Sequence, residues 1–337
     1  MELRRWGVLA VGLWVALLVA GCAGREVAPA GVPLRTEPGK RFIFPLIMVG
    51  ASEIGPAVVL PTPQPALSKV AGVAWPHEDG RNRALDLAGV GAGVTLDWSY
   101  DQERAAAAEA VGVRYLPMQW GCRNGARSVR TDAVAFFARK HPGATWLAFN
   151  EPDHGGQANC TPAQAAEAYW ALREALAAVD PRARVYCCGT AWPAGHIEWT
   201  AAFGEAYRER YGTWPAVDGL HVHSYTHVWE DRFNYLARQT ELLAVRAWAN
   251  GQPWLAGKSM IVSEWGVLSS SWWSEDAGRI AREYLPAMRR WFQAQGWIVA
   301  DVWFASWYSD TMYQPSNVWE RETGRLTAVG EAWRRAR

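Results

Sequence analysis

Two glutamates, each at the end of an apolar and β-prone run, are the side chains best placed to carry out chemistry together. Glu151 follows Thr145–Phe149 and precedes Pro152, and Glu264 follows Ile261–Ser263. Because proline cannot donate to a strand ladder, Pro152 ends its strand and fixes where Glu151 points. Either glutamate alone could be a loop residue paired with an arginine. Together, on parallel strands, they could cleave a glycosidic bond, one giving a proton and the other attacking the anomeric carbon.

The elements that must position these glutamates alternate along the chain from Lys69 onward. Apolar, β-branched and aromatic runs predict strands, and Ala- and Arg-rich amphipathic stretches predict helices, one of them started by Thr161 and Pro162. Eight such alternations predict an α/β protein with a single (β/α)8 TIM barrel, in which Glu151 ends the fourth strand and Glu264 the seventh. The predicted strands are Val70–Trp75, Gly93–Trp98, Val113–Trp120, Thr145–Glu151, Arg184–Thr190, Val217–Tyr225, Ser259–Trp265 and Trp297–Trp307. The predicted helices are Gln102–Ala110, Thr131–Lys140, Thr161–Val179, Trp199–Tyr211, Arg232–Asn250, Glu275–Gln295 and a last helix that ends at Arg335.

Composition narrows the class of protein. The chain has 337 residues, half of them hydrophobic, which suits one barrel of about 250 residues with additions. The formal net charge is +1, so nothing points to nucleic acid as a partner. There are 22 tryptophans, which an Ala-, Arg- and Trp-rich composition could explain. Indole rings also cover the apolar faces of sugars, so we expect some of them to line a groove.

The N-terminus has the features of a targeting segment. Arg4 and Arg5 precede the uncharged, apolar run Trp6–Ala20, and Val19-Ala20-Gly21-Cys22 is similar to a bacterial lipobox, in which the cysteine is lipidated. An uncleaved N-terminal anchor is the alternative. Either way we expect an exported monomer, anchored on the outer side of the cytoplasmic membrane or at the cell surface. The predicted divisions are a signal peptide over 1–22, a tether and extended Pro-rich segment over 23–68, and the catalytic barrel over 69–337.

Seven short segments carry a resemblance to a known family, and they occur in its order across the barrel. The chain resembles the Asl1-like glycosyl hydrolase catalytic domain, the group that contains glycoside hydrolase family 128 and belongs to the clan of retaining (β/α)8 glycosidases. One departure is Ser224, where the family usually has tryptophan. The matching segments are Ala71–Trp75, Asp97–Tyr100, Leu116–Gly121, Phe149–Asp153, His223–Tyr225, Ser263–Gly266 and Val302–Phe304.

The resemblance implies a retaining, endo-acting hydrolase of a polysaccharide such as a β-1,3-glucan, with no cofactor and no metal. It implies Glu151 as general acid/base and Glu264 as nucleophile. Asn150 would bond the 2-hydroxyl of the sugar under attack, and Tyr225 would orient Glu264. Since two close carboxylates repel each other, we expect the pKa of the acid to rise. The candidate sugar platforms are Trp120, Trp265 and Trp303.

Two other interpretations use the same residues. His221 and His223 share strand parity and could hold a metal, as in metal-dependent barrel hydrolases. Against that, strand Arg184–Thr190 offers no ligand, so His221 is better explained as a core histidine and His223 as a sugar-contacting donor. The second alternative is a non-catalytic carbohydrate-binding lipoprotein on a degenerate barrel. Such a protein would not need carboxylates at both strand ends.

The cysteines divide into two kinds. Cys122 follows the third predicted strand and Cys160 the fourth, so both lie in neighbouring loops at the rim. In an exported protein these two can form a disulfide. Cys187 and Cys188 are adjacent on the fifth strand, so they should point to opposite faces and act as small buried thiols.

Overall fold

Parallel strands form the centre of the protein in this computed structural model, which describes residues 62–229, 232–269 and 274–336. The strand order is β3-β2-β1-β10-β9-β7-β6-β5-β4. Its two ends, β3 and β4, are consecutive pieces of one extended stretch, separated by Leu116 and Pro117, so the order returns to its start. The fold is therefore α/β and consistent with a TIM-like barrel. The strands are β1 Val70–Val73, β2 Val94–Thr95, β3 Arg114–Tyr115, β4 Met118–Gln119, β5 Thr145–Ala148, β6 Arg184–Thr190, β7 Gly219–Trp229, β8 Arg232–Phe233, β9 Ser259–Ser269 and β10 Ile298–Trp303.

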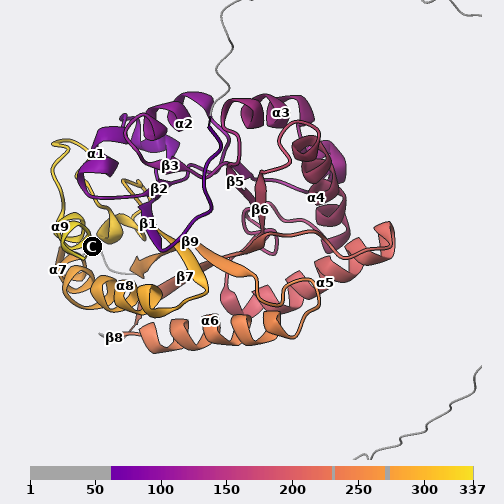
Figure 1. Ribbon diagram of the computed structural model, residues 1–337. Coiled ribbons are helices and arrows are strands. Elements are labelled where there is room, and N and C mark those ends of the chain that lie inside the picture. Colours follow the sequence, from indigo (N-terminus) through magenta and orange to yellow (C-terminus); the bar gives the residue numbers. More distant parts are fainter. Residues whose placement is uncertain (1–61, 230–231, 270–273, 337) are drawn as a thin grey trace, which may run out of the picture. The chain divides into compact units, whose positions relative to one another are not determined.

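Helices surround the strands on the outside, as Figure 1 shows. The helices α1 to α8 lie between successive strands along the chain, as crossovers between parallel strands require, and α9 follows β10. The helix α4 begins with a capping box in which the Thr161 hydroxyl accepts from the Gln164 amide and the Gln164 side chain accepts from the Thr161 amide. The helices are α1 Ala84–Gly89, α2 Gln102–Glu109, α3 Thr131–Lys140, α4 Pro162–Ala177, α5 Pro193–Tyr211, α6 Tyr235–Asn250, α7 Ser274–Arg279, α8 Leu285–Ala294 and α9 Ala328–Arg335.

The strands β1 and β10, which come first and last along the chain, are neighbours in the sheet although they are far apart in the sequence. Val70 on β1 pairs with Ala300 on β10, and Val73 pairs with Trp303. Gly72 makes the approach of β2 possible, because a Cβ there would lie 2.2 Å from the Val94 carbonyl oxygen. The site-bearing strands are thus held in a continuous parallel array.

Large aromatic side chains fill the layer between β9, β10 and the last helix. Trp265, Trp303 and Trp333 are each at most 1% exposed. The ring centroids of Trp265 and Trp303 are 4.6 Å apart, in an edge-to-face arrangement. The Arg289 guanidinium lies over the Trp333 ring at 4.1 Å. The high tryptophan content therefore serves the core in this region.

The structure follows the predicted elements, with informative differences. Each predicted strand overlaps an observed one, although β7 and β9 continue past the predicted ends to Trp229 and Ser269. The third predicted strand is interrupted at Pro117, which cannot donate to a ladder. The predicted helix Glu275–Gln295 is two helices joined by a π-helical turn at Ile280–Tyr284. The helix α1 and the short strand β8, antiparallel to β7, were not predicted.

The lipobox, Cys22 and the segment up to residue 61 lie outside the described residues. No helix among those described is long and apolar enough to span a bilayer.

Both pairs of cysteines are joined as disulfides. Cys122 and Cys160 form a disulfide with their Cα atoms 5.6 Å apart, within the usual range. Cys187 and Cys188 are also joined to each other, with Cα atoms 3.1 Å apart. The prediction of two thiols on opposite faces is therefore wrong, because the regular alternation of side chains along a strand does not hold at this step.

Candidate active site

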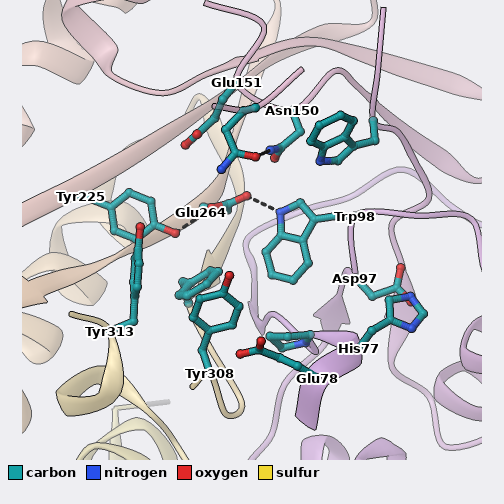
Figure 2. A pocket seen from close by; sticks show the side chains of 14 residues that line it. His77, Glu78, Asp97, Trp98, Asn150, Glu151, Tyr225, Glu264, Tyr308 and Tyr313 are labelled. Atoms are coloured by element: carbon teal, nitrogen blue, oxygen red, sulfur yellow. Dashed lines mark hydrogen bonds and ion pairs between the residues drawn. The ribbon is translucent and has the colours of Figure 1, made fainter. Parts of the chain in front are cut away.

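A cavity of about 370 Å³ opens where the parallel strands end, and its lining includes both Glu151 and Glu264. Figure 2 shows Glu264 at its centre, between Tyr225 and Trp98, with Glu151 and Asn150 on the neighbouring wall. The cavity is rich in carboxylates and aromatic rings. Its lining residues are Pro76, His77, Glu78, Asp97, Trp98, Trp120, Asn150, Glu151, Gln157, Tyr225, Glu264, Phe304, Tyr308 and Tyr313.

The carboxylate of Glu264 is buried and accepts hydrogen bonds from a residue of β7 and from a residue in the turn after β2. The Tyr225 hydroxyl donates to Glu264 Oε2 at 2.7 Å, and the Trp98 indole N–H donates to Oε1 at 2.5 Å. Nε2 of His223 lies 3.2 Å from the same Oε1. His223 and Glu264 are direct partners in the register of β7 and β9. The carboxylate therefore has little freedom to turn, as a positioned nucleophile requires.

His223 stands between the two glutamates. Its Nδ1 lies 2.9 Å from Glu151 Oε1, and its side chain is fully buried. One carboxylate oxygen of Glu151 and one of Glu264 lie within 4.8 Å of each other. His223 does not line the cavity, so its predicted role as a direct sugar contact is not what its position provides. It acts on the glutamates instead.

The charges of this trio are coupled, and the pKa directions differ from expectation. Burial favours protonated Glu151, but the hydrogen bond and charge of His223 outweigh it and lower the pKa of Glu151. Burial raises the pKa of Glu264, and repulsion from Glu151 adds to that. The prediction that the pKa of Glu151 is raised is therefore wrong for the ligand-free protein. Burial disfavours charged His223, yet the two glutamates raise its pKa, so the trio keeps a proton to higher pH than a free histidine would.

Two residues of the site have left-handed backbone conformations that side chains rarely adopt. Glu151 has φ +43° and Trp98 has φ +63°. The Glu151 amide donates to the Gly189 carbonyl at 2.7 Å, which ties the end of β5 to β6. Such conformations cost about 1–3 kcal/mol each and persist where the surroundings impose them, often at functional sites. The indole of Trp98 reaches Glu264 from this backbone, and the carboxylate of Glu151 reaches His223.

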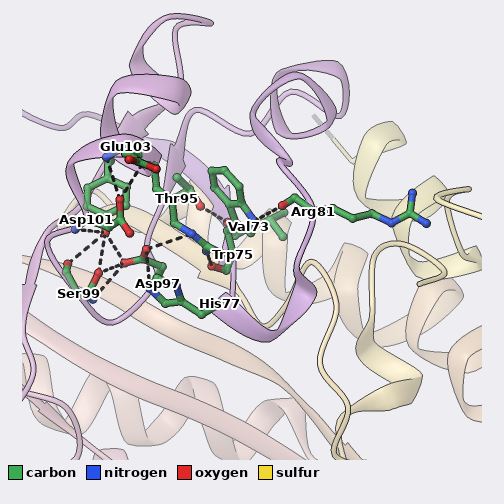
Figure 3. A network of polar contacts seen from close by, with 11 residues as sticks. Val73, Trp75, His77, Arg81, Thr95, Asp97, Ser99, Asp101 and Glu103 are labelled. Carbon is green, nitrogen blue, oxygen red and sulfur yellow. Dashed lines mark hydrogen bonds and ion pairs between the residues drawn. The ribbon is translucent and has the colours of Figure 1, made fainter. Parts of the chain in front are cut away.

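Asp97 anchors the turn that carries Trp98 (Figure 3). Its Oδ1 accepts from the Ser99 hydroxyl at 2.8 Å and from the hydroxyl of Tyr115, which lies on β3. Asp97 is buried, so these bonds form in a poorly solvated region. The motif Asp97–Tyr100 therefore positions the indole that touches Glu264.

The predicted sugar-binding residues divide between cavity and core. Trp120 is 39% exposed and lines the cavity, as a platform must. Asn150 also lines it, and its buried Oδ1 has no hydrogen-bond partner among the described residues, so it is available to a hydroxyl donor. Trp265 and Trp303 are fully buried in the core, so the prediction that they are platforms is wrong. Their side chains point to the other face of their strands.

The two histidines of the alternative metal interpretation are separated, because His223 lies between the glutamates of the site and His221 lies in the core. His221 Nδ1 lies 2.9 Å from the Ser263 hydroxyl and Nε2 lies 2.8 Å from the Ala148 carbonyl, so both ring nitrogens are engaged in the core. The described residues contain two sets with metal-like spacing. One is the trio Glu151, His223 and Glu264. The other is His77, Asp97 and Asp101, where Arg104 Nε is 3.7 Å from Asp97 Oδ2 and would oppose a cation.

Sequence reasoning missed several residues of the wall. Trp98 stood in a matching motif but was given no role, and its contact with Glu264 depends on a backbone conformation that composition does not reveal. Phe304, Tyr308 and Tyr313 form an aromatic group beside Tyr225, with the Phe304 and Tyr313 centroids 4.8 Å apart. Their position after β10, at the same rim as the glutamates, was the available signal.

Comparisons with known proteins agree with this geometry. The sequence profile described as "Glycosyl hydrolase catalytic core" matches residues 72–333. No curated protein matches the chain significantly. Among solved structures, a family 128 (subgroup II) endo-β-1,3-glucanase from Pseudomonas viridiflava is 22% identical with TM-score 0.61, covering 79% of this chain and 97% of its own. A subgroup I endo-β-1,3-glucanase from Amycolatopsis mediterranei, in complex with laminaritriose, is 22% identical with TM-score 0.57, covering 80% and 100%.

A third similar structure is a subgroup III curdlan-specific exo-β-1,3-glucanase from Blastomyces gilchristii in complex with glucose. It is 23% identical with TM-score 0.57, covering 79% of this chain and 97% of its own. At these identities the structures establish a shared fold. The profile match spans most of the chain and includes both glutamates, which confirms the resemblance seen in the sequence. The protein belongs to the glycosyl hydrolase catalytic core family and is a glycoside hydrolase.

Proposed function

We propose that the protein is a retaining, endo-acting hydrolase of β-1,3-glucan, built on a single (β/α)8 barrel. The observation that carries the mechanism is the pair Glu151 and Glu264, whose nearest oxygens lie within 4.8 Å of each other at the floor of one cavity. Retaining enzymes have carboxyl groups about 5–5.5 Å apart, because the nucleophile attacks without an intervening water. The buried set of donors around Glu264 supports its assignment as nucleophile.

The reaction proceeds in two displacements at these residues. Ionised Glu264 attacks the anomeric carbon while Glu151 gives a proton to the leaving glycosidic oxygen. Glu151 then removes a proton from water, which attacks the same carbon and releases Glu264. Because the pKa of Glu151 is low in the ligand-free protein, His223 supplies its proton once substrate displaces water from the cavity. The free Oδ1 of Asn150 accepts from the 2-hydroxyl of the sugar under attack.

The substrate class rests on the similar structures. Those from Pseudomonas viridiflava and Amycolatopsis mediterranei are endo-β-1,3-glucanases, and the latter is in complex with laminaritriose. The one from Blastomyces gilchristii is exo-acting. Endo action is supported here by a second hollow that continues from the catalytic cavity past Trp120, which leaves room for a chain on that side.

The test is hydrolysis of laminari-oligosaccharides followed by product sizing and by NMR of the first anomer formed. We expect short oligosaccharides with the β configuration retained. Glu264→Ala should lose turnover, and azide should restore cleavage with inverted product. Glu151→Ala should slow substrates with poor leaving groups most, because these need the proton. Inverted anomers from the wild type would exclude double displacement, and full activity of Glu264→Ala would exclude the assigned nucleophile.

We also propose that the protein is exported and anchored through a lipid on Cys22. The support is the sequence Val19-Ala20-Gly21-Cys22 after a short apolar run. Expressed in a bacterium with labelled fatty acid, the wild type should enter the detergent phase and carry label. Cys22→Ser should carry none, and a labelled Cys22→Ser protein would contradict the proposal.

A further inference from the structure

A second hollow of about 950 Å³ continues from the catalytic cavity. The two share His77, Trp98, Trp120 and Gln157 in their walls, so they form one cleft with Trp120 at the junction. A chain that places one sugar over the glutamates would extend from there along Trp120 into the second hollow. The residues lining this part therefore act on the sugars next to the cleaved bond.

The two parts of the cleft have opposite charge. Four carboxylates line the catalytic cavity. The second hollow is lined by the arginines Arg123, Arg127 and Arg130, and by one acidic residue, Asp101. The Asp101 carboxylate is already used, because its Oδ1 accepts from two backbone amides at the start of α2. The carboxylates of the cavity are those of Glu78, Asp97, Glu151 and Glu264.

The three arginines are exposed, and none forms an ion pair with a carboxylate in the part of the chain that the structure describes. Arg123 makes one long bond, at 3.4 Å, to the Gln157 carbonyl. Guanidinium groups suit planar anionic groups, since they can form two parallel hydrogen bonds to one carboxylate or sulfate. Their charge is available to a ligand in the hollow.

The segment that carries the arginines is firmly held. Its first residue, Cys122, is bonded to Cys160 in the next loop. The buried Gln119 side chain donates to the carbonyls of Gly121 at 2.8 Å and Ser128 at 3.1 Å, which closes the segment on itself. The backbone from which the three arginines extend is therefore held in place beside the hollow.

We propose that the cleft selects a polysaccharide chain with negatively charged substituents, placed on the sugars that lie beyond Trp120 and absent from the sugar over the glutamates. The carboxylates of the catalytic cavity repel an anionic group there, while the arginines attract one in the neighbouring positions. This inference rests on the proposed function for the identity of the backbone. It adds that the natural chain carries carboxylate, sulfate or phosphate groups.

The test compares two laminari-oligosaccharides of equal length, one neutral and one with primary hydroxyls partly oxidised to carboxylates. The wild type should cleave the oxidised form with kcat/KM on the order of tenfold higher, since each exposed charge pair contributes a little. The triple variant Arg123→Gln, Arg127→Gln, Arg130→Gln should lose this preference, so that the ratio of kcat/KM for the oxidised form to that for the neutral form falls to about one. High salt should also remove the preference in the wild type.

The matched control is Arg139→Gln, Arg290→Gln, Arg325→Gln, which removes the same charge from exposed arginines outside both parts of the cleft. It should keep the wild-type preference. Equal rates of the wild type on both substrates would overturn the inference and leave the proposed function intact. If neither substrate is cleaved, the proposed function fails. The affinity for each oligosaccharide, measured by tryptophan fluorescence, then decides whether the cleft prefers anionic chains. Tighter binding of the oxidised form by the wild type alone would support the inference, and equal binding would overturn it.

Discussion

Three side chains, two from β7 and one from the turn after β2, decide the charge state of Glu264. Trp98 and Tyr225 donate hydrogen bonds to Glu264, and His223 adds its charge. All three lower the cost of the ionised form, which burial and Glu151 oppose. The balance among them makes the trio sensitive to the loss of one member.

Replacing His223 by asparagine should shift the pH dependence. The variant removes the charge that lowers the pKa of Glu264, so that pKa rises further above its ordinary value. Since only the ionised carboxylate attacks, the acidic limb of the kcat/KM profile should move to higher pH, with the greatest loss of rate below neutrality. Hydrolysis rates over a pH series measure this. An unchanged acidic limb with uniformly lower rates would indicate a purely structural role.

Trp120→Ala should weaken substrate binding more than it destabilises the protein. Its ring is 39% exposed at the junction of the two parts of the cleft, so its loss should raise KM roughly three- to tenfold. Trp170→Ala is the matched control, because Trp170 is 37% exposed and stacks on Tyr211 away from the cleft. The control should keep KM. Equal effects of the two changes on KM would contradict a platform role.

The positions of the two glutamates in the site could be predicted from the sequence, but the faces of the strands from which the tryptophans extend could not. Glu151 and Glu264 could be found because strand ends and proline have simple consequences for the backbone. The prediction for Trp265 was wrong because this residue directly follows Glu264, and neighbours on a strand point to opposite faces. Trp98 could not be found, since its left-handed backbone breaks that same rule.

At the scale of elements, the loops after β4 and β5 form the wall between the two parts of the cleft. The Cys122–Cys160 disulfide joins them across a separation of 38 residues. The Asn150 amide donates to the Trp120 carbonyl at 2.9 Å, so the ends of the two strands are also tied by their backbones. Glu151 and Trp120 are therefore positioned by one shared unit.

Removing this disulfide should loosen the unit and lower stability. The Cys122→Ser, Cys160→Ser variant should lose about 3–4 kcal/mol of unfolding free energy, because a loop of this length is then open in the unfolded chain. Urea denaturation measures the loss. The kcat/KM for long chains should fall more than that for short ones, since the second hollow is bordered by Cys122. A stability equal to that of the wild type would show that the bond contributes nothing in solution.

Element types were largely predictable, and element ends were not. Apolar periodicity gave the strands and helices because burial on one or both faces imposes it. The helix α5 begins at Pro193, well before the predicted Trp199, since its first turns lack a clear apolar stripe. The π-helical turn after Arg279 leaves no mark in the sequence pattern, because it adds a single local widening to a regular helix.

For the molecule as a whole, the helix α9 completes the core behind β9, the strand that bears Glu264. Trp333 on α9 lies against Trp265 and Trp303, with centroids 6.2 and 6.4 Å apart. These two side chains extend from the other face of the strands that bear the site. The C-terminal residues thus support β9 and β10 from outside.

Trp333→Ala should therefore cost about 3–5 kcal/mol of stability, as large aromatic truncations in cores do. The protein that remains folded should keep a near-normal kcat, because Trp333 does not line the cleft. Thermal or urea unfolding, with rates corrected for the folded fraction, checks both parts. Trp333→Phe should retain most of the stability. A variant as stable as the wild type would mean that α9 is dispensable to the core.

The pairing of β1 with β10 sets an order for folding. Val70 meets Ala300 in the register, and that contact spans nearly the whole described chain. While the protein emerges from the ribosome, the early strands must wait with an open edge until the last one arrives. Loop-closure entropy makes such distant contacts slow to form. The neighbourhood of Glu264 on β9 is therefore completed only after β10 has been made, and a chain interrupted before residue 298 lacks the strand that pairs with β9 and with β1.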